Sequence, residues 1–344
     1  MKKRRLAVRS VALLLCATVI GACSASAAGT GQIDTGVHLR DPFVLEKDGT
    51  YYMYGTGLKW NGYGCVYSAD LENWSDPVRV FTPPEGFDGD GDWWAPECWE
   101  WNGSFYLFAT YHSRVTGKRG VAIFRSDDPL GPFENITDGH ITPADHDAID
   151  GTLYVDGDGR PWMVYVGEWT DNEDGAGDMM AARMNDDLTC FVSEPILLFR
   201  GNEPRWASGR ITDGPFLYRT ETGRLLMLWS NTNSDGYCVG VAWSSNGRID
   251  GKWRQQPWEL YKEDETHADG GHGMIFTAPD GTMMLSVHSP NYATEDQNEK
   301  GVFIPVDDIG DTLVLSEKNT FFTRTLYKLY YALMRFVTVF DGLF

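Results

Sequence analysis

Three aspartates and one histidine begin similar segments of this chain, although they lie far apart in the sequence. Asp41, Asp150, Asp213 and His272 each stand before a short apolar run that leads into a polar turn ending in glycine. Carboxylates that come close together repel, so at least one pKa rises, and a pair with separated pKa values can donate and accept protons in glycoside hydrolysis. A single aspartate at a strand start usually caps backbone amides, but three at equivalent positions favour a functional site.

The similarity extends to five segments, each of which reads as two short strands joined by a tight turn. The turn glycines are spaced 54, 56, 64 and 58 residues apart, with further strand-like runs between the segments. A repeat of this length built from hairpins is typical of propeller blades, each a small four-stranded sheet. The segments begin, and their turns end, at Asp41 and Gly49, Ala95 and Gly103, Asp150 and Gly159, Asp213 and Gly223, and His272 and Gly281.

The sequence therefore predicts an all-β fold, a five-bladed β-propeller over residues 29–316, followed by a C-terminal helical extension over residues 317–344. The 38 glycines and the 13% of aromatic residues agree with many short strands and tight turns. In a propeller the first strand of each blade lies nearest the axis, so equivalent strand starts ring one end of that axis. The three aspartates and His272 should converge there, with Ala95 at the corresponding position of the second blade.

The first 28 residues read as a signal peptide and not as part of the fold. A basic start, "MKKRRLAVRS", precedes the apolar stretch "VALLLCATVI", which is short for a membrane span. "IGAC" at Ile20–Cys23 resembles a bacterial lipoprotein signal that would leave Cys23 lipidated, whereas "ASA" at Ala25–Ala27 suits an ordinary signal peptidase. Either cleavage predicts an exported protein with an extracellular, periplasmic or cell-surface location, and an uncleaved anchor is the third reading.

The charge balance limits the partners. The chain has 29 basic and 49 acidic residues, a formal net charge of −20. This charge argues against nucleic acid and polyanionic glycans, and it fits a neutral oligosaccharide or polysaccharide. Beyond the first 28 residues, four cysteines are scattered without a CxxC pair, which argues against a zinc site. We expect no organic cofactor.

Together these segments resemble glycoside hydrolase family 43 over roughly residues 36–306. That family consists of five-bladed propeller enzymes that mostly cleave α-L-arabinofuranosides and β-D-xylosides with inversion. The order and spacing of four motifs carry the resemblance: "RDPFV" (Arg40–Val44), "WAPE" (Trp94–Glu97), "AIDGTLYVDGDGRPWMVY" (Ala148–Tyr165) and "GGHGMIF" (Gly270–Phe276).

The resemblance implies a role for each motif residue. Asp41 would be the general base, and Asp150 would tune the pKa of the general acid and orient it. His272 would coordinate Ca²⁺ or another cation, or the waters of that cation, on the propeller axis. The fourth-blade motif of the family is usually Glu-Gly-Pro, in which the glutamate is the general acid, whereas this chain has Asp213 at that place.

The aspartate at this place leaves three readings open. It is one methylene shorter, which moves its proton back by about 1–1.5 Å, and such a displacement costs on the order of 100-fold in rate if nothing compensates. Asp213 remains the acid in a tighter pocket, another carboxylate takes its task, or catalysis is lost and a sugar-binding propeller remains. Glu168 is the best substitute, because it ends the second strand of the third blade and so returns to the end where Asp150 lies. Glu97 and Glu203 are weaker candidates.

Five side chains near the predicted mouth are candidates for contact with a sugar. Indole rings pack on the apolar faces of sugars, although blade cores also use tryptophan. The imidazole of His288 would face the pocket or form a structural hydrogen bond. The guanidinium of Arg210 could pair with a pocket carboxylate and lower the pKa of that carboxylate. The five are Trp93, Trp94, Trp169, His288 and Arg210.

The stretch from residue 319 to residue 344 lacks the propeller pattern and is apolar and aromatic. Arg324, Lys328 and Arg335 are spaced four and seven residues apart, so they form one basic stripe on a helix. Such a stripe is typical of an interfacial membrane helix, and equally of a helix that packs over the propeller or against another chain.

The sequence therefore predicts an exported glycoside hydrolase of the arabinofuranosidase or xylosidase type that works by single displacement. Asp41 would deprotonate a water molecule while Asp213 protonates the leaving oxygen. One alternative is the related fructan-acting propeller group, although "LRDPFV" stands where that group has Asn-Asp-Pro-Asn. The other is a non-catalytic glycan-binding propeller. Membrane association through a lipidated Cys23 or through the C-terminal helix accompanies each reading.

Overall fold

The computed structural model describes residues 31–58, 60–291 and 299–341, with side chains described as far as Arg335. The chain divides into two units, residues 1–31 and residues 32–344. All the strands and helices named here lie in the second unit. The predicted signal peptide, residues 1–28 with Cys23, lies outside the described residues.

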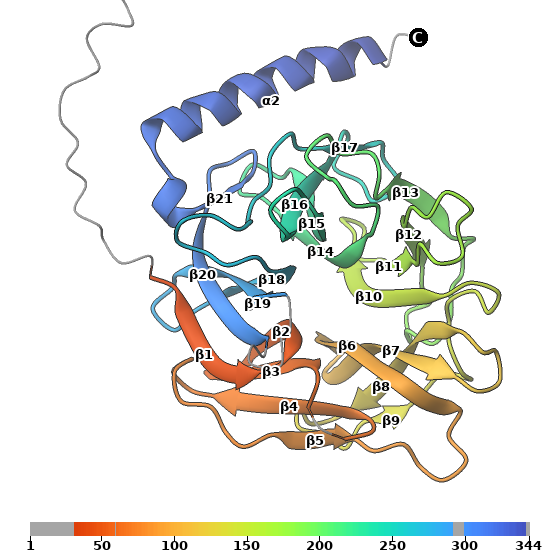
Figure 1. Cartoon of the computed structure of the whole chain (residues 1–344). Helices are drawn as coiled ribbons and strands as arrows, with labels where there is room; N and C mark the ends of the chain where they lie inside the picture. Colours follow the sequence, from red (N-terminus) through yellow and green to blue (C-terminus); the bar gives the residue numbers. More distant parts are fainter. Residues whose placement is uncertain (1–30, 59, 292–298, 342–344) are drawn as a thin grey trace, which may run out of the picture. The chain divides into compact units, whose positions relative to one another are not determined.

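The described part of the second unit forms five antiparallel sheets, which Figure 1 shows arranged around a common centre. The first sheet holds β2 (Arg40–Lys47), β3 (Thr50–Thr56), β4 (Tyr63–Ser68) and β5 (Val78–Phe81). The second holds β6 (Gly89–Trp101), β7 (Ser104–Ser113), β8 (Arg119–Ser126) and β9 (Glu134–Asn135). The third holds β10 (Ala148–Val155), β11 (Pro161–Gly167), β12 (Asp178–Arg183) and β13 (Ile196–Arg200).

The last two sheets complete the ring. The fourth holds β14 (Asp213–Arg219), β15 (Leu225–Thr232), β16 (Tyr237–Ser244) and β17 (Trp253–Gln255). The fifth holds β18 (Gly271–Thr277), β19 (Met283–Ser289), β20 (Lys300–Asp308) and β1 (Ile33–His38), and β21 (Leu313–Leu315) pairs with β20. The predicted all-β five-bladed propeller is confirmed.

The turn glycines explain why the same hairpin recurs five times. All five adopt a left-handed φ, between 77° and 87°, which residues with a Cβ rarely adopt. Each glycine therefore closes a tight turn between the first and second strands of its blade, and it brings the chain back to the end where the first strand began.

The ring is closed by a strand from the start of the unit. β1 pairs antiparallel with β20, with Ile33 opposite Phe303, so residues nearly 270 positions apart share one blade. The hydroxyl of Thr35 donates to the carbonyl of Gly301 at 2.7 Å and fixes this pairing. β1 is thereby the outermost strand of the fifth blade, and it pairs with an edge of β20 that would otherwise be open.

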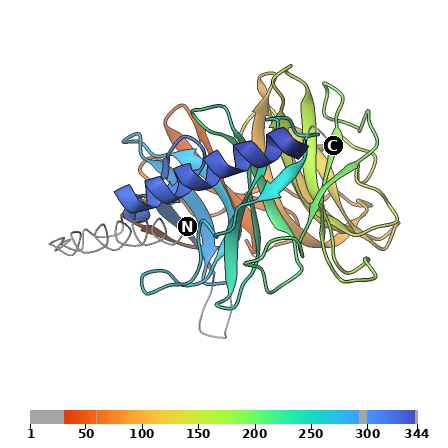
Figure 2. The ribbon, with the colours of Figure 1, turned by 90° about the horizontal axis from the view of Figure 1, so that it is seen from above.

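The predicted C-terminal helix is present as α2 (Phe321–Asp341), after a short 3₁₀ turn, η1 (Ser316–Lys318). It packs on the fourth and fifth blades (Figures 1 and 2). Tyr331 is fully buried against Trp243, with ring centroids 5.7 Å apart, and Tyr327 lies 5.2 Å from Trp258. Arg335 pairs with Asp311 at 2.9 Å. No described helix combines the length and the apolar character that crossing a membrane requires.

Candidate active site

A cavity of about 470 Å³ opens where the inner strands of the blades begin. All five blades contribute to its wall, and it contains four of the predicted carboxylates and the predicted histidine. The lining residues are Arg40, Asp41, Thr56, Trp94, Ile149, Asp150, Glu168, Trp169, Ile211, Asp213, Thr232, Tyr237, His272 and Asn291.

One backbone distortion recurs at the mouth of every blade and aims these side chains. One residue in the inner strand of each blade has a left-handed φ, between 42° and 57°, and lies within a shift of the strand register. For a residue with a Cβ this conformation costs on the order of 1–3 kcal/mol, and it is concentrated at functional sites. The five residues are Asp41, Ala95, Asp150, Gly214 and His272.

In the fourth blade, the residue at the ring position is not the predicted one. Gly214, and not Asp213, has the left-handed backbone there. Asp213 is the residue before it and corresponds in strand register to Arg40 and Trp94. Counting back from the turn glycine misplaced it by one, because the aspartate lies ten residues before Gly223 and the ring residues lie eight or nine before theirs. Asp213 still reaches the cavity, but from beside the ring.

Asp41 lies among groups that favour its ionised form. Its Oδ2 accepts a hydrogen bond of 2.6 Å from Thr56, and its Oδ1 lies 3.2 Å from Nδ1 of His272 and 3.4 Å from Nδ1 of His288. Burial raises the pKa of Asp41, but the two imidazoles and the guanidinium of Arg40 outweigh burial, so the pKa falls below its ordinary value. Asp41 is therefore suited to accept a proton.

Asp213 lies in the opposite electrostatic setting. Burial raises its pKa well above the ordinary value, and the neighbouring Asp150 raises it further. The phenol of Tyr237 donates to Asp213 Oδ2 at 2.9 Å, which partly opposes that rise. Burial and the charge of Asp41 also raise the pKa of Asp150, against the influence of His272. Asp213 is therefore suited to hold and donate a proton.

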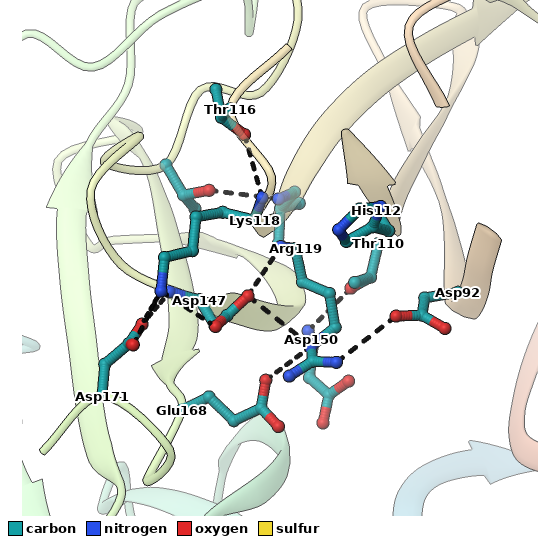
Figure 3. A network of polar contacts seen from close by, with 12 residues as sticks. Asp92, Thr110, His112, Thr116, Lys118, Arg119, Asp147, Asp150, Glu168 and Asp171 are labelled. Atoms are coloured by element: carbon teal, nitrogen blue, oxygen red, sulfur yellow. Dashed lines mark hydrogen bonds and ion pairs between the residues drawn. The ribbon is translucent and has the colours of Figure 1, made fainter. Parts of the chain in front are cut away.

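Glu168 belongs to an ionic network on the third-blade side of the cavity (Figure 3). Its Oε2 accepts a hydrogen bond of 2.7 Å from Arg119 Nε, and the same guanidinium reaches Asp92 at 3.3 Å. Burial raises the pKa of Glu168 above its ordinary value, and Arg119 only partly opposes that rise. The ion pair occupies one oxygen of this carboxylate, so Glu168 is placed as a wall residue that is held by its neighbour.

The rest of the network anchors the loops around that wall. Lys118 reaches Asp171 at 2.7 Å and Asp147 at 3.2 Å, and the backbone amide of Arg119 donates to Asp147 at 2.8 Å (Figure 3). These contacts tie β8 to the segment that precedes β10 and to the loop that follows β11. They hold Arg119, and through it Glu168, in one position.

The predicted tryptophans separate into two groups. Trp94 and Trp169 line the cavity, and the guanidinium of Arg119 lies 5.3 Å from the Trp94 ring. Trp93 does not line this cavity, but it lines an adjoining one together with Trp94 and Thr56. Its ring stacks on Tyr111 at 5.7 Å and contacts Tyr63 at 5.5 Å, as part of an aromatic core.

Two other predicted contact residues lie outside the lining of the cavity. The side chain of His288 is fully buried, and its Nδ1 accepts a hydrogen bond of 3.2 Å from the Asp41 amide. Burial lowers its pKa to about 4, so it is a structural imidazole behind Asp41. Arg210 points to a loop, where its Nη1 donates to the carbonyl of Asp174 at 2.6 Å.

Seven lining residues were not found from the sequence: Arg40, Thr56, Ile149, Ile211, Thr232, Tyr237 and Asn291. Arg40 directly precedes Asp41 and pairs with Glu299 at 3.0 Å. Arg40 and Thr56 follow from strand pairing, because they stand opposite each other in the first hairpin. Tyr237 gave no signal, since it starts the third strand of its blade in the unremarkable segment "GYCVG".

The donor atoms around His272 decide whether the predicted cation site can bind Ca²⁺ directly. Nδ1 of His272 lies 3.2 Å from Asp41 Oδ1 and 3.7 Å from Asp150 Oδ2. Ca²⁺ takes six to eight oxygen ligands, and this group offers one imidazole nitrogen between two carboxylates. Among the described residues, the one set of three ligand atoms close enough to share an ion is elsewhere, at Asp264, His267 and Glu317, where Lys318 already occupies Asp264. The axial residues do not form a direct calcium cage.

The cavity contains one carboxylate that is suited to accept a proton and another that is suited to donate one. The pKa of one carboxylate is lowered and that of another is raised within the same cavity, which is the division of labour that glycoside hydrolysis requires. A five-bladed propeller with such an axial cavity defines a class of glycoside hydrolases. The sequence model described as "Glycosyl hydrolases family 43" matches residues 36–305, and the chain belongs to that family.

Individual relatives agree with the family. The solved structure of an endo-arabinase from Bacteroides thetaiotaomicron VPI-5482 is 36% identical and has a TM-score of 0.71, over 80% of this chain and 96% of that one. An extracellular exo-α-(1→5)-L-arabinofuranosidase of Cellvibrio japonicus is 29% identical over 181 residues, and an extracellular endo-α-(1→5)-L-arabinanase of Bacillus subtilis is 28% identical over 178. These matches cover 48% and 49% of this chain, and the chain spans about half of each relative, 48% and 54%.

Proposed function

We propose that this chain hydrolyses α-L-arabinofuranosidic linkages in oligosaccharides or polysaccharides, with β-D-xylosidic linkages as the second substrate class. The relatives named above are arabinan-acting enzymes, which supports the first class. An acidic chain with a formal charge of −20 agrees with a neutral glycan. The match to family 43 favours this function over the fructan-acting alternative.

The proposed mechanism is a single displacement with inversion. Asp41 deprotonates a water molecule on one side of the anomeric carbon, and Asp213 protonates the leaving oxygen on the other side. Asp150 keeps the pKa of Asp213 high through its nearby charge. The observation that carries the proposal is the opposite shift of two pKa values in one cavity: that of Asp41 is lowered and that of Asp213 is raised.

Glu168 is proposed to position substrate and not to act as the acid. The pKa values of both carboxyls are raised, but that of Asp213 is raised well above its ordinary value, whereas the hydrogen bond of 2.7 Å from Arg119 opposes the rise at Glu168. Trp94 and Trp169 are the proposed platforms for the sugar ring, since both line the cavity and indoles pack on apolar sugar faces.

Two further properties belong to the proposal. A cation on the axis would be held through its own waters by His272, and no step above depends on it. We propose export of the protein, because the two curated relatives above are named extracellular and the first 28 residues have a signal pattern. Lipidation at Cys23 is the finer form of this proposal.

The test is hydrolysis of aryl α-L-arabinofuranosides, aryl β-D-xylosides, arabinan and xylan oligomers by the purified chain. Proton NMR of the first product identifies its anomer, and we expect inversion. Asp41→Asn should lose activity on every substrate that the wild-type chain cleaves. A retained anomer would contradict the mechanism. Binding of oligosaccharides without any cleavage would contradict the proposed hydrolase activity and support the glycan-binding alternative. The argument for that alternative is that the side chain of Asp213 is shorter than the usual glutamate.

A further inference from the structure

Helix α2 presents a second apolar face that nothing in the described part of the chain covers. Its inner face holds the buried Tyr327 and Tyr331. On the outside, large apolar side chains remain open to solvent over the whole described length of the helix. Their exposed fractions are 88% for Phe321, 75% for Phe322, 38% for Leu326, 66% for Leu329 and 59% for Leu333.

These side chains form a narrow ridge. Phe322, Leu326, Leu329 and Leu333 follow one another at spacings of four, three and four residues, which keeps them within about 60° around the helix. A strip with this heptad spacing is the seam by which one helix packs on another, and it is narrower than the face of a helix that lies in a membrane. We call these four residues the α2 ridge; Phe321 lies about 100° around the helix from Phe322 and extends the exposed apolar surface beside the ridge.

The ridge lies beside an apolar hollow. A cavity of about 430 Å³ opens between the first half of α2 and the propeller, and Leu326 belongs to both the hollow and the ridge. Its lining includes the apolar Trp258, Leu260, Val314 and Leu315 together with the charged Glu259 and Lys318. A surface that carries both projecting phenylalanines and an apolar hollow is complementary to itself, as a twofold interface requires.

Two of the three basic side chains of the helix are engaged within the chain, which favours another helix over a lipid surface as the partner. Arg324, Lys328 and Arg335 lie about 200–240° around the helix from Phe322, away from the ridge. Arg335 is paired with Asp311, and Arg324 donates to Asn319 at 2.6 Å. On its side towards the basic residues the ridge is flanked by the uncharged Thr325 and Ala332. An anionic membrane would repel a chain of charge −20.

We propose that the α2 ridge and its hollow form a twofold interface between two copies of this chain. Phe321 and Phe322 would together bury on the order of 300 Å² per copy, and the leucines and the hollow add to this area. The total is near the lower end of stable interfaces, which bury about 800 Å² per partner. We therefore expect a reversible dimer that forms at concentrations on the order of 10 μM.

Sedimentation velocity of the purified chain from about 1 to about 200 μM tests the proposal. The wild-type chain should shift from monomer to dimer, and Leu329→Glu/Leu333→Glu should remain monomeric with an unchanged melting temperature, because both side chains are exposed. Val115→Glu is the matched control, since Val115 is 84% exposed on a loop away from α2, and it should dimerise like the wild type.

Three outcomes would overturn the proposal. The wild type could remain monomeric throughout, or the double variant could dimerise as strongly as the wild type. The third outcome is a monomeric wild-type chain that sediments with phosphatidylcholine vesicles and a double variant that does not. That result would make lipid the occupant of the ridge.

Discussion

The backbone amide of Gly214 donates a hydrogen bond of 3.0 Å to Oδ2 of Asp150. At the other four blade junctions, the amide of the left-handed residue donates to a side chain on the second strand of the preceding blade. The acceptors are Thr56 for Ala95, Thr110 for Asp150, Ser230 for His272 and His288 for Asp41, at 2.7–3.2 Å.

The remaining junction has no such acceptor. In strand register, the corresponding residue of the third blade is Val166, which pairs with Ile149 and has no polar side-chain atom. The carboxylate of Asp150 takes its place. The residue whose charge raises the pKa of Asp213 therefore also holds the backbone directly after Asp213.

We expect Val166→Thr to restore the missing acceptor and to release Asp150. The hydrogen bond from Gly214 lowers the pKa of Asp150, so its loss should let that pKa rise. A more protonated Asp150 repels the Asp213 charge less, so the pKa of Asp213 should fall. The basic limb of the pH–rate profile should move to lower pH by about 0.5–1 unit, with a loss of kcat on the order of 3- to 10-fold.

Val166→Ala is the control for this variant, because it alters packing without adding a hydroxyl. Its basic limb should stay at the wild-type pH. If the alanine and threonine variants shift the limb equally, the hydrogen-bond exchange is not the cause.

Tyr237→Phe should shift the same limb in the opposite direction. The phenol hydrogen bond lowers the pKa of Asp213, so its removal should raise that pKa and extend activity to higher pH. We also expect kcat to fall about 10-fold, because the acid loses the partner that orients it. Tyr261→Phe is the matched control, since its hydroxyl donates to the Ala268 carbonyl outside the cavity. A limb that moves to lower pH would contradict the assignment.

The wild-type profile of kcat/KM against pH should be a bell with a broad plateau. The reactive form has Asp41 ionised and Asp213 protonated. Activity is lost as the pH falls through the pKa of Asp41, which lies below 3.8, and as the pH rises through the raised pKa of Asp213. Asp41→Asn should abolish activity at every pH and not shift either limb. An acid limb well above pH 5 would show that another group is the base.

The fold could be predicted because its signals are local. A tight turn that needs a left-handed glycine can be recognised from about four adjacent residues. Gly49 and Gly281 therefore identify equivalent hairpins without knowledge of the rest of the chain. The placement of Asp41, Asp150 and His272 followed from the same count.

The offset of Asp213 also had a signal, which the count from the turn did not use. Each left-handed residue is followed directly by a proline or a glycine: Pro42, Pro96, Gly151, Pro215 and Gly273. Alignment on these residues puts Gly214 on the ring. The packing of the half-buried Trp93 and the burial of His288 had no local signal, because both depend on rings and strands that come from distant parts of the chain.

Comparison of Asp213→Asn with Glu168→Gln should identify the general acid. We expect Asp213→Asn to lose on the order of 10³-fold in kcat on arabinan oligomers, and far less on aryl glycosides, whose leaving groups need no proton. Glu168→Gln keeps an acceptor for Arg119 and should lose less than about 10-fold on both substrates. If Glu168→Gln loses more activity than Asp213→Asn, and its loss depends strongly on the leaving group, then the general acid is Glu168 in the third blade.

A buried carboxyl outside the cavity should make stability depend on pH. Glu97 is 4% exposed, and burial raises its pKa from 4.5 to about 8, although the indole of Trp99 donates to it at 3.1 Å. Because the folded pKa lies above the unfolded one, the stabilising contribution of the neutral form is complete below about pH 4.5 and is lost as the pH rises through about 8.

Glu97→Gln keeps the acceptor for Trp99 but cannot ionise, so its free energy of unfolding should gain on that of the wild type as the pH rises from about 4.5 to about 8. Each unit of pKa shift corresponds to about 1.4 kcal/mol. Urea unfolding at a series of pH values measures the difference between the two chains. Glu100→Gln is the control, because this exposed glutamate only pairs with Lys47 at the surface and its removal should leave the slope unchanged. A constant difference between Glu97→Gln and the wild type across this range would mean that Glu97 is already ionised in the folded protein.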